Sequence, residues 1–231
     1  MKKTLIIGAS SGIGNDLLNK QIELGNQVYA SYNTNEINFD HENLTKFKLD
    51  ILNYNFDSNL ITENLDSLVY CPGTIKLKPF TSIKEEDFIE EFNINVMGFI
   101  KVFKSVVNLL KNSISASVVG FSSVCAKKGF NYHSSIATSK SALEGLFLSL
   151  AKEYAPKIRF NIISPSIVNT PLSSHLLNHE KKIENIKSTH PLQKIGSPHD
   201  ISSMANFLIS NDAEWMTGTN LSIDGGKANL T

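Results

Sequence analysis

Cysteine and net charge are both scarce in this sequence of 231 residues. Two cysteines, Cys71 and Cys125, are too few for a disulfide framework and are typical of free thiols in a reducing compartment. The 22 basic and 22 acidic side chains cancel, whereas proteins that bind nucleic acids or membrane surfaces usually carry a basic excess. We therefore expect a cytoplasmic protein whose partners are neither nucleic acids nor membranes.

Long apolar runs and flexible linkers are missing as well. No apolar stretch approaches the roughly 18 residues that cross a bilayer, and the run after Met1-Lys2-Lys3 ends at Gly8, too early for a signal peptide. The 13 glycines and 7 prolines fall below the usual share of about 12%, which excludes long low-complexity linkers. Hydrophobic residues make up 41%, enough for a sizeable core. We expect one domain over residues 1–231.

Short apolar runs alternate with longer segments of helical period, which is typical of a parallel sheet with crossover helices on both faces. Strands are predicted at Thr4–Ile7, Gln27–Ala30, Phe47–Leu49, Ser67–Tyr70, Ala116–Gly120, Arg159–Ile163 and Asn220–Ile223. Helices are predicted at Gly14–Leu24, near Leu60, and at Lys84–Leu110, Ser135–Tyr154, Leu172–Lys187 and His199–Ile209. The sequence thus predicts a single-domain α/β fold: a Rossmann-type, doubly wound, seven-stranded parallel sheet.

A glycine-rich turn joins the first predicted strand to the first helix. Its G-x-x-x-G-x-G spacing, over residues 8–14, differs from the G-x-G-x-x-G fingerprint. Glycines let the backbone turn sharply and approach a pyrophosphate, which the amides and dipole of a helix N-terminus attract. The turn therefore predicts a dinucleotide site with contacts from Gly8, Ser10, Ser11, Gly12, Ile13 and Gly14.

This turn and several later segments resemble the short-chain dehydrogenase/reductase family across essentially the whole chain. Cys71-Pro72-Gly73 stands where the family usually has Asn-Ala-Gly. The segments that match its catalytic positions are Asn93-Ile94-Asn95-Val96-Met97-Gly98, Ser122-Ser123-Val124 and Ala137-Thr138-Ser139-Lys140. The C-terminal matches are Pro165 to Thr170, with Ser166 replacing a glycine, and Thr217-Gly218 to Asp224-Gly225-Gly226.

The resemblance implies an NAD(P)-dependent oxidoreductase, similar to bacterial 3-oxoacyl-carrier-protein reductases, that transfers hydride between the nicotinamide and a small carbonyl or alcohol. It also implies a homodimer or homotetramer and a substrate lid at about 171–195. The implied catalytic residues are Asn95, Ser123 and Lys140. Besides the glycine-rich turn, the implied cofactor contacts are Tyr32, Asn33, Asp50, Ile51, Cys71, Pro72, Gly73, Lys140, Pro165, Val168 and Thr170.

One departure from the family concerns the proton donor. The family's catalytic tyrosine lies four residues before the lysine and thirteen after the serine, and both counts lead to Ile136. Tyr132 and His133, expected on the same helical face as Ile136, are two candidate replacements, although each would be displaced by about one turn. Water held by Ser123, Asn95 and Lys140 is a third. The rival hypothesis is a catalytically silent cofactor-binding protein with a sensing or structural role.

Cofactor preference depends on the segment after the second predicted strand, Ser31-Tyr32-Asn33-Thr34-Asn35-Glu36. NAD usually meets an acidic residue at this strand end. The missing acid favours NADP over NAD, although no Arg or Lys in this segment could pair with its phosphate. Asp50, after the third strand, is either a turn cap or, by the resemblance, a contact to the adenine amine.

Four further expectations concern residues outside the motifs. His175 and His179 lie four apart in a predicted helix but lack a third ligand, so we expect no metal site. Cys125 is expected to be a small buried thiol. The region 172–186 carries an apolar stripe, Leu176, Leu177, Ile183 and Ile186. The apolar residues expected to pair the two long helices with a second copy are Phe99, Val102, Phe103, Val106, Leu146, Phe147 and Leu150.

Overall fold

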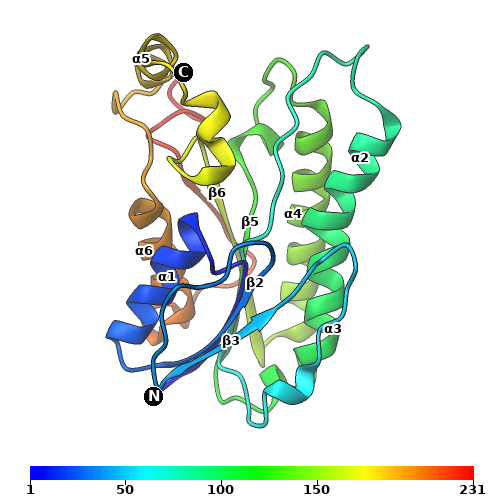
Figure 1. Ribbon diagram of the computed structural model, residues 1–231. Coiled ribbons are helices and arrows are strands. Elements are labelled where there is room, and N and C mark those ends of the chain that lie inside the picture. The colour runs from blue at the N-terminus through cyan, green and yellow to red at the C-terminus, as the bar shows by residue number, and fades with distance from the viewer.

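Seven parallel strands form one sheet in the computed structural model, which describes residues 1–231 (Figure 1). They are β1 (Lys3–Ile7), β2 (Gln27–Tyr32), β3 (Leu44–Lys48), β4 (Ser67–Tyr70), β5 (Ala116–Phe121), β6 (Ile158–Pro165) and β7 (Asn220–Ile223). Their order in the sheet is β3-β2-β1-β4-β5-β6-β7. The direction of winding reverses between β1 and β4, and ligands bind at such a switch point in open α/β sheets. The predicted fold class is confirmed, while the third strand lies a few residues before its predicted position.

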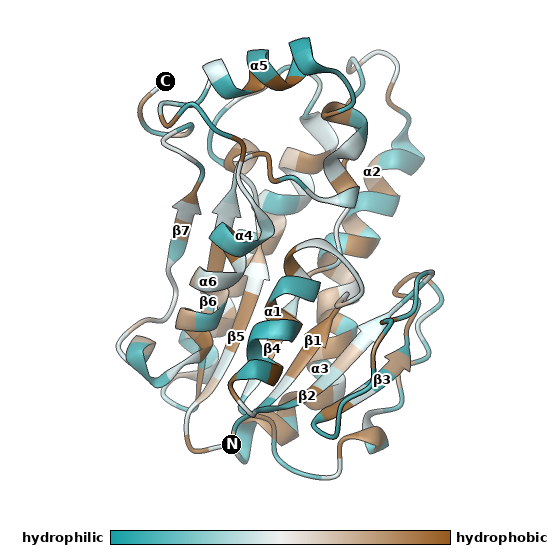
Figure 2. Cartoon of the chain, turned by 60° about the vertical axis from the view of Figure 1, so that its left-hand side comes forward, coloured by the Kyte–Doolittle hydropathy of each residue, from teal (hydrophilic) through white to brown (hydrophobic).

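Helices cover both faces of the sheet (Figure 1). α1 (Gly12–Glu23) and α6 (Pro198–Ile209) pack together on one face. The other face carries α2 (Glu85–Phe92), α3 (Gly98–Lys111) and α4 (Ser134–Tyr154). Each side of the sheet buries its own apolar cluster. Hydrophobic segments gather on the sheet and on the helix surfaces that face it (Figure 2). None of the helices is both long and apolar enough to cross a membrane.

The apolar residues expected to pair α3 and α4 with a second copy mostly belong to the core of this chain. Phe99, Val102, Phe103, Val106 and Phe147 are all buried, and the rings of Phe99 and Phe147 lie 4.6 Å apart. That part of the prediction was wrong, because the two helices bury these side chains against the sheet and each other. Leu146 and Leu150 are half-buried and pack on the edge of the same cluster.

The long helix predicted at Lys84–Leu110 is interrupted by one π-helical turn, Asn93–Met97, between α2 and α3. The Tyr70 hydroxyl donates to the Ile94 carbonyl at 2.6 Å, which ties this turn to β4. Gly98 follows the turn where the helix approaches the sheet closely: a Cβ atom there would lie 2.3 Å from the Tyr70 hydroxyl. The turn sets the position of Asn95, which lies in its middle.

The single helix predicted at Leu172–Lys187 is also divided. The chain forms a 3₁₀ helix at Pro171–Leu176 and then α5 (Glu180–Ser188). His175 lies in the first and His179 directly before the second, so the two histidines do not share one helical face. α5 lies beyond the carboxyl ends of the strands, beside the C-terminus (Figure 1).

Candidate functional site

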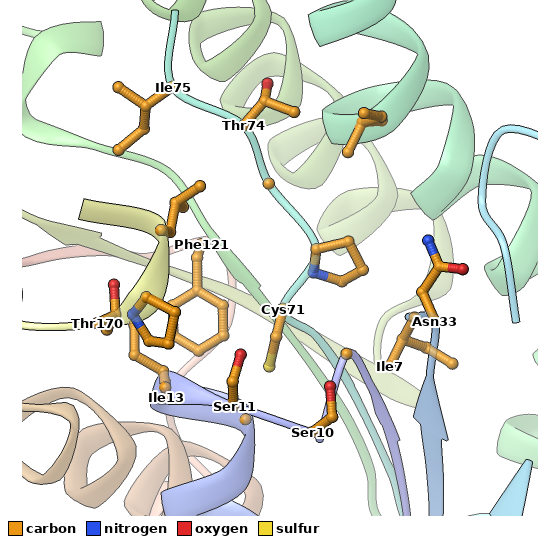
Figure 3. A pocket seen from close by; sticks show the side chains of 18 of the residues that line it. Ile7, Ser10, Ser11, Ile13, Asn33, Cys71, Thr74, Ile75, Phe121 and Thr170 are labelled. Atoms are coloured by element: carbon orange, nitrogen blue, oxygen red, sulfur yellow. The ribbon is translucent and has the colours of Figure 1, made fainter. Parts of the chain in front are cut away.

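A cavity of about 540 Å³ opens at the carboxyl ends of the strands, around the switch point between β1 and β4. Every residue expected to contact a cofactor lines it. Ser123 lines it too, whereas Asn95 does not. The lining also includes residues that were not among the expected contacts: Thr34, Asn35, Thr74, Ile75, Ile94, Phe121, Leu172 and Ser173. Figure 3 shows Ser10, Ser11 and Ile13 at one end of the cavity, with Thr74 and Ile75 at the other.

The glycine-rich turn forms an open cradle at the start of α1. Ser11 precedes the helix without capping it through its side chain, so the first-turn amides are free for an anionic ligand. Gly8 and Gly12 have φ of +79° and +55°. A Cβ atom on Gly14 would lie only 2.2 Å from the Gly8 carbonyl oxygen. These features fit the pyrophosphate of a dinucleotide.

Cys71 lies in the middle of the cavity with its sulfur directed toward the start of α1 (Figure 3). Burial raises the pKa of its thiol to about 12, so the sulfur stays neutral at physiological pH. Cys125 is buried outside the cavity lining, and burial raises the pKa of its thiol as well. Both cysteines are free thiols. Neither side chain has the anionic character of a nucleophile.

Lys140 projects from α4 into the cavity and is only 7% exposed. Its ammonium donates to the Phe121 carbonyl at 2.8 Å, which anchors the side chain at the end of β5. Burial lowers the pKa of this ammonium from 10.5 to about 8. A group with this pKa is a usable proton donor near neutral pH.

Ser123 lies in the cavity lining, whereas Asn95 lies behind it. Ser123 lines the cavity and accepts a long hydrogen bond of 3.3 Å from the Cys125 amide, which leaves its own O–H free. Asn95 is fully buried behind Gly73. A Cβ atom on Gly73 would lie 3.3 Å from Asn95 Oδ1 and 3.6 Å from Lys140 Nζ, so both atoms border the same small space.

The resemblance to the family places a tyrosine at position 136, where this chain has isoleucine. Ile136 is 3% exposed and lines the same cavity as Ser123 and Lys140. Tyr132 and His133 were expected to share its helical face, but α4 begins only at Ser134. Tyr132 has φ +69° and is 57% exposed, and neither residue lines the cavity. The expectation of one helical face was wrong because the loop turns away before the helix begins.

The Asp50 side chain lines the cavity but also closes a turn. Its two oxygens accept from the Leu52 amide and the Asn53 side chain, both at 2.9 Å. These hydrogen bonds, the one from Asn53 first, hold the pKa of Asp50 below its usual range. The carboxylate therefore stays charged and fixed in place at the cavity wall.

Two residues near the site had no signal in the sequence. Lys48 lies on β3 directly beside Tyr32 at the end of β2, and no acidic side chain pairs with it. Glu91 is a fully buried carboxyl on α2, behind the cavity. A parallel strand and a helix bring these residues to the site, and only the tertiary fold sets both placements.

A comparison with protein families gives one match over nearly the whole chain. The family model described as Enoyl-(Acyl carrier protein) reductase matches residues 8–228. Among curated proteins, the 3-oxoacyl-[acyl-carrier-protein] reductase FabG of Rickettsia prowazekii is 30% identical over 233 residues, which cover 97% of this chain and 96% of that protein. The L-xylulose reductase of Mus musculus is 26% identical over the same shares of the two chains.

Solved structures of dehydrogenases and related proteins have the same fold over nearly the whole chain. The ligand-free aldohexose dehydrogenase of Thermoplasma acidophilum superposes with a TM-score of 0.89 at 27% identity, covering 98% of this chain and 94% of that one. ElxO, solved with NADP bound, superposes with a TM-score of 0.86 at 27% identity, covering 98% of both chains.

Proposed function

The chain belongs to the short-chain dehydrogenase/reductase family, and we propose that it is an NAD(P)-dependent oxidoreductase that interconverts a small carbonyl compound and its alcohol. The observation that carries this proposal is the convergence of the glycine-rich cradle, Ser123 and Lys140 on one cavity. When bound, the nicotinamide cofactor supplies or accepts the hydride. The protein has to hold the cofactor, orient the substrate oxygen and deliver a proton to it.

The cavity supports cofactor binding along its whole length. The first turn of α1 offers free amides to the pyrophosphate, and Asp50 offers a fixed acceptor to the adenine amine. Lys140 keeps two ammonium hydrogens beyond the one that it gives to Phe121, enough to reach the ribose hydroxyls. Among related structures, ElxO contains NADP and a mutant of 4-hydroxyisoleucine dehydrogenase contains NADH.

Lys48 supports a preference for the phosphorylated cofactor. The segment after β2 carries no acid at the strand end to hold a free ribose hydroxyl, while Asn33, Thr34 and Asn35 line the cavity there. Because β3 pairs with β2 in parallel, Lys48 stands opposite Tyr32 at the start of this segment, with its side chain exposed. We therefore expect tighter binding of NADPH than of NADH, and Lys48→Ala to reduce only the NADPH affinity.

For the proton, the geometry favours water over either neighbouring aromatic side chain. Tyr132 and His133 lie outside the cavity lining, whereas Ser123 and Lys140 line it. A water molecule held by these two groups reaches a substrate oxygen without any movement of the 130–133 loop. Lys140, with its pKa lowered to about 8 by burial, replaces the proton that this water gives up.

Ile136 favours a second candidate function, a cofactor-binding protein without turnover. Its aliphatic side chain places an apolar surface where the family has a phenol, and nothing in the cavity lining replaces that hydroxyl at the same point. Such a protein would keep the cofactor cradle for sensing or for assembly. The two candidates share cofactor binding and differ in catalysis.

One pair of measurements tests the proposal. Titration of NADPH fluorescence with the protein should show saturable binding, and Gly14→Ala should abolish it because the added carbon meets the Gly8 carbonyl. A panel of small aldehydes and ketones should then show NADPH oxidation. Absence of binding at millimolar cofactor would refute both candidates, whereas binding without turnover would leave the silent protein as the answer.

A further inference from the structure

A buried polar seam runs behind the cavity, where α2 and its π-helical turn pack against α4 (Figure 1). One helix contributes Glu91 and Asn95, one turn apart, and the other contributes Ser135 and Ser139, also one turn apart. All four residues are at most 1% exposed. Helix contacts of this kind are normally apolar, because a polar group without a partner is costly when buried.

Three oxygens in this seam have no hydrogen-bond partner: Glu91 Oε2, Asn95 Oδ1 and Ser135 Oγ. The orientation of Asn95 follows from its neighbour. Ser139 gives its hydroxyl hydrogen to the Ile136 carbonyl, so its oxygen accepts the Asn95 amide at 3.2 Å. Asn95 Oδ1 is thereby turned toward the space in front of Gly73 that Lys140 Nζ also borders.

The two carboxylate oxygens of Glu91 differ in their contacts: one accepts hydrogen bonds and the other has no partner. Its Oε1 accepts from the Lys76 amide at 3.0 Å and from the Thr74 hydroxyl at 3.3 Å, which holds the loop after β4 in place. Those contacts do not need a charge. Oε2 has no partner of ordinary hydrogen-bond geometry. The Ser135 hydroxyl is nevertheless close enough to the carboxyl to lower its pKa, against the rise caused by burial.

We propose that Glu91 is a buried carboxylic acid that supplies protons to Lys140 through this seam, and so takes over part of the task of the absent phenol. The inference rests on the proposed reduction of a carbonyl. In this route the Ser135 hydroxyl takes the proton from Glu91 and gives it to a water molecule in the space bordered by Gly73. Asn95 Oδ1 holds this water by accepting a hydrogen bond from it, and the water passes the proton to Lys140. Glu91 touches neither substrate nor cofactor, so it is a positioning and proton-holding residue.

The proton transfer balances without any other reactant. The Glu91 carboxylic acid becomes a carboxylate, and the neutral Lys140 amine, left after protonating the substrate oxygen through water, becomes an ammonium again. The Ser135 hydroxyl and the water each accept one proton and release one, so they end unchanged. Solvent then returns a proton to Glu91 before the next turnover.

The electrostatics of the seam agree with this assignment. Burial raises the pKa of Glu91, and the neighbouring Ser135 and Lys76 groups oppose that rise. Once Glu91 is charged, it raises the pKa of Lys140 and keeps the ammonium protonated. The titratable or charged groups that act on this pair from the surrounding elements are Lys76, Cys71 and Cys125.

The first test uses the cofactor-free protein. Its infrared spectrum at pH 7 should contain the C=O band of a protonated carboxylic acid, and Glu91→Gln should remove that band. The matched control is Glu90→Gln, which alters the neighbouring residue, whose carboxylate pairs with Lys76 on the protein surface. Identical spectra for all three proteins would overturn the proposal. This readout does not depend on turnover, so it separates a failure of the seam from a failure of the proposed function.

The second test uses the pH dependence of carbonyl reduction. Glu91→Gln should lower kcat at least about tenfold with little change in the KM for NADPH. The basic limb of its pH profile should move down by about one pH unit, because the variant cannot take on the negative charge that Glu91 acquires when it gives up its proton. Ser135→Ala should lower kcat while keeping the infrared band, which covers the case in which Glu91→Gln does not fold. An unchanged kcat in both variants would contradict the proposal.

Discussion

At the scale of single residues, Ile136 has the largest effect on the chemistry proposed for this site. By the resemblance to the family it stands at the position of the catalytic tyrosine, and it lines the same cavity as Lys140 and Ser123. The surrounding side chains therefore still suit a hydroxyl group. With isoleucine at this position, turnover separates an enzyme with an unusual proton route from a protein that only binds its cofactor.

Ile136→Tyr should create or raise carbonyl reductase activity. The new phenol would stand between Ser123 and Lys140, and general acid catalysis is worth about 10² to 10⁴ in rate. The measurement is NADPH oxidation with a panel of ketones, and Ile136→Phe is the control that adds the ring without the hydroxyl. Equal rates for the two variants would show that the pocket has lost the geometry of the family.

Tyr132→Phe should leave the activity of the unmodified protein unchanged. Tyr132 is 57% exposed and does not line the cavity, so its hydroxyl has no path to a substrate oxygen. The measurement is the steady-state kcat of Tyr132→Phe and of the unmodified protein with the best substrate of the panel. A large loss of kcat would assign the proton to Tyr132 and contradict the water route.

Lys140 also makes the stability of the fold depend on pH. Its pKa is about 8 when folded and 10.5 when unfolded, so the unfolded chain binds more protons between these values. The free energy of unfolding therefore rises with pH across this window, by up to about 3 kcal/mol for this group. Denaturant titrations from pH 7 to 10.5 should show this rise in the unmodified protein and a flatter curve for Lys140→Met. Lys152→Met, at an exposed position of the same helix, is the control.

At the scale of the elements, the junction of α2 and α3 positions Asn95 behind the cavity. Its π-helical turn carries Asn95 and is tied to β4 through Tyr70. The same junction brings the helix close enough to the sheet that only a glycine fits at position 98. π-helical turns inside longer helices are frequent at functional sites.

Gly98→Ala should destabilise the protein by about 1 to 3 kcal/mol, because the added methyl group meets the Tyr70 hydroxyl and the Ile51 side chain at less than 2.5 Å. Chemical denaturation gives the value. Gly129→Ala is the comparison, since a Cβ atom on Gly129 meets nothing within 4 Å. Similar stability for both variants would mean that the junction moves freely, and Asn95 with it.

At the scale of the whole molecule, the sheet gathers segments from most of the chain at one edge. The glycine-rich turn, the ends of β4 and β5, the start of α4 and the loop after β6 all border the same cavity. The same packing buries most of the apolar side chains of α3 and α4 inside the chain. What remains on the outer surface of α4 is Leu148, 63% exposed, beside the bare backbone of Gly145.

We expect a homodimer or homotetramer that uses this outer surface of α4. A helix that exposes a leucine next to a glycine allows the close approach of a second helix. Light scattering at micromolar concentration should give a multiple of 25.5 kDa for the unmodified protein and a smaller mass for Leu148→Asp. A monomer in both cases would leave α4 solvent-exposed.

Much of this protein could be predicted from local patterns. The seven strands, the glycine-rich turn and the residues that line the cavity follow from apolar periodicity, glycine spacing and resemblance to one family. These features have short-range causes: a strand needs alternating or continuous apolar residues, and a turn near a helix N-terminus needs glycine. The boundaries of interrupted helices were less predictable. The break at residues 93–97, for example, is tied to the distant strand β4 through Tyr70.

Only the tertiary structure decided which polar groups meet. Lys48 reaches the end of β2 because β3 pairs beside it, and Glu91 faces Ser135 because α2 packs on α4. It also decided that Tyr132 turns away from the cavity and that Phe99 and Phe147 point into the core. Contacts between residues far apart in the chain leave no periodic signal, because their geometry depends on how whole elements pack and not on the neighbours along the sequence.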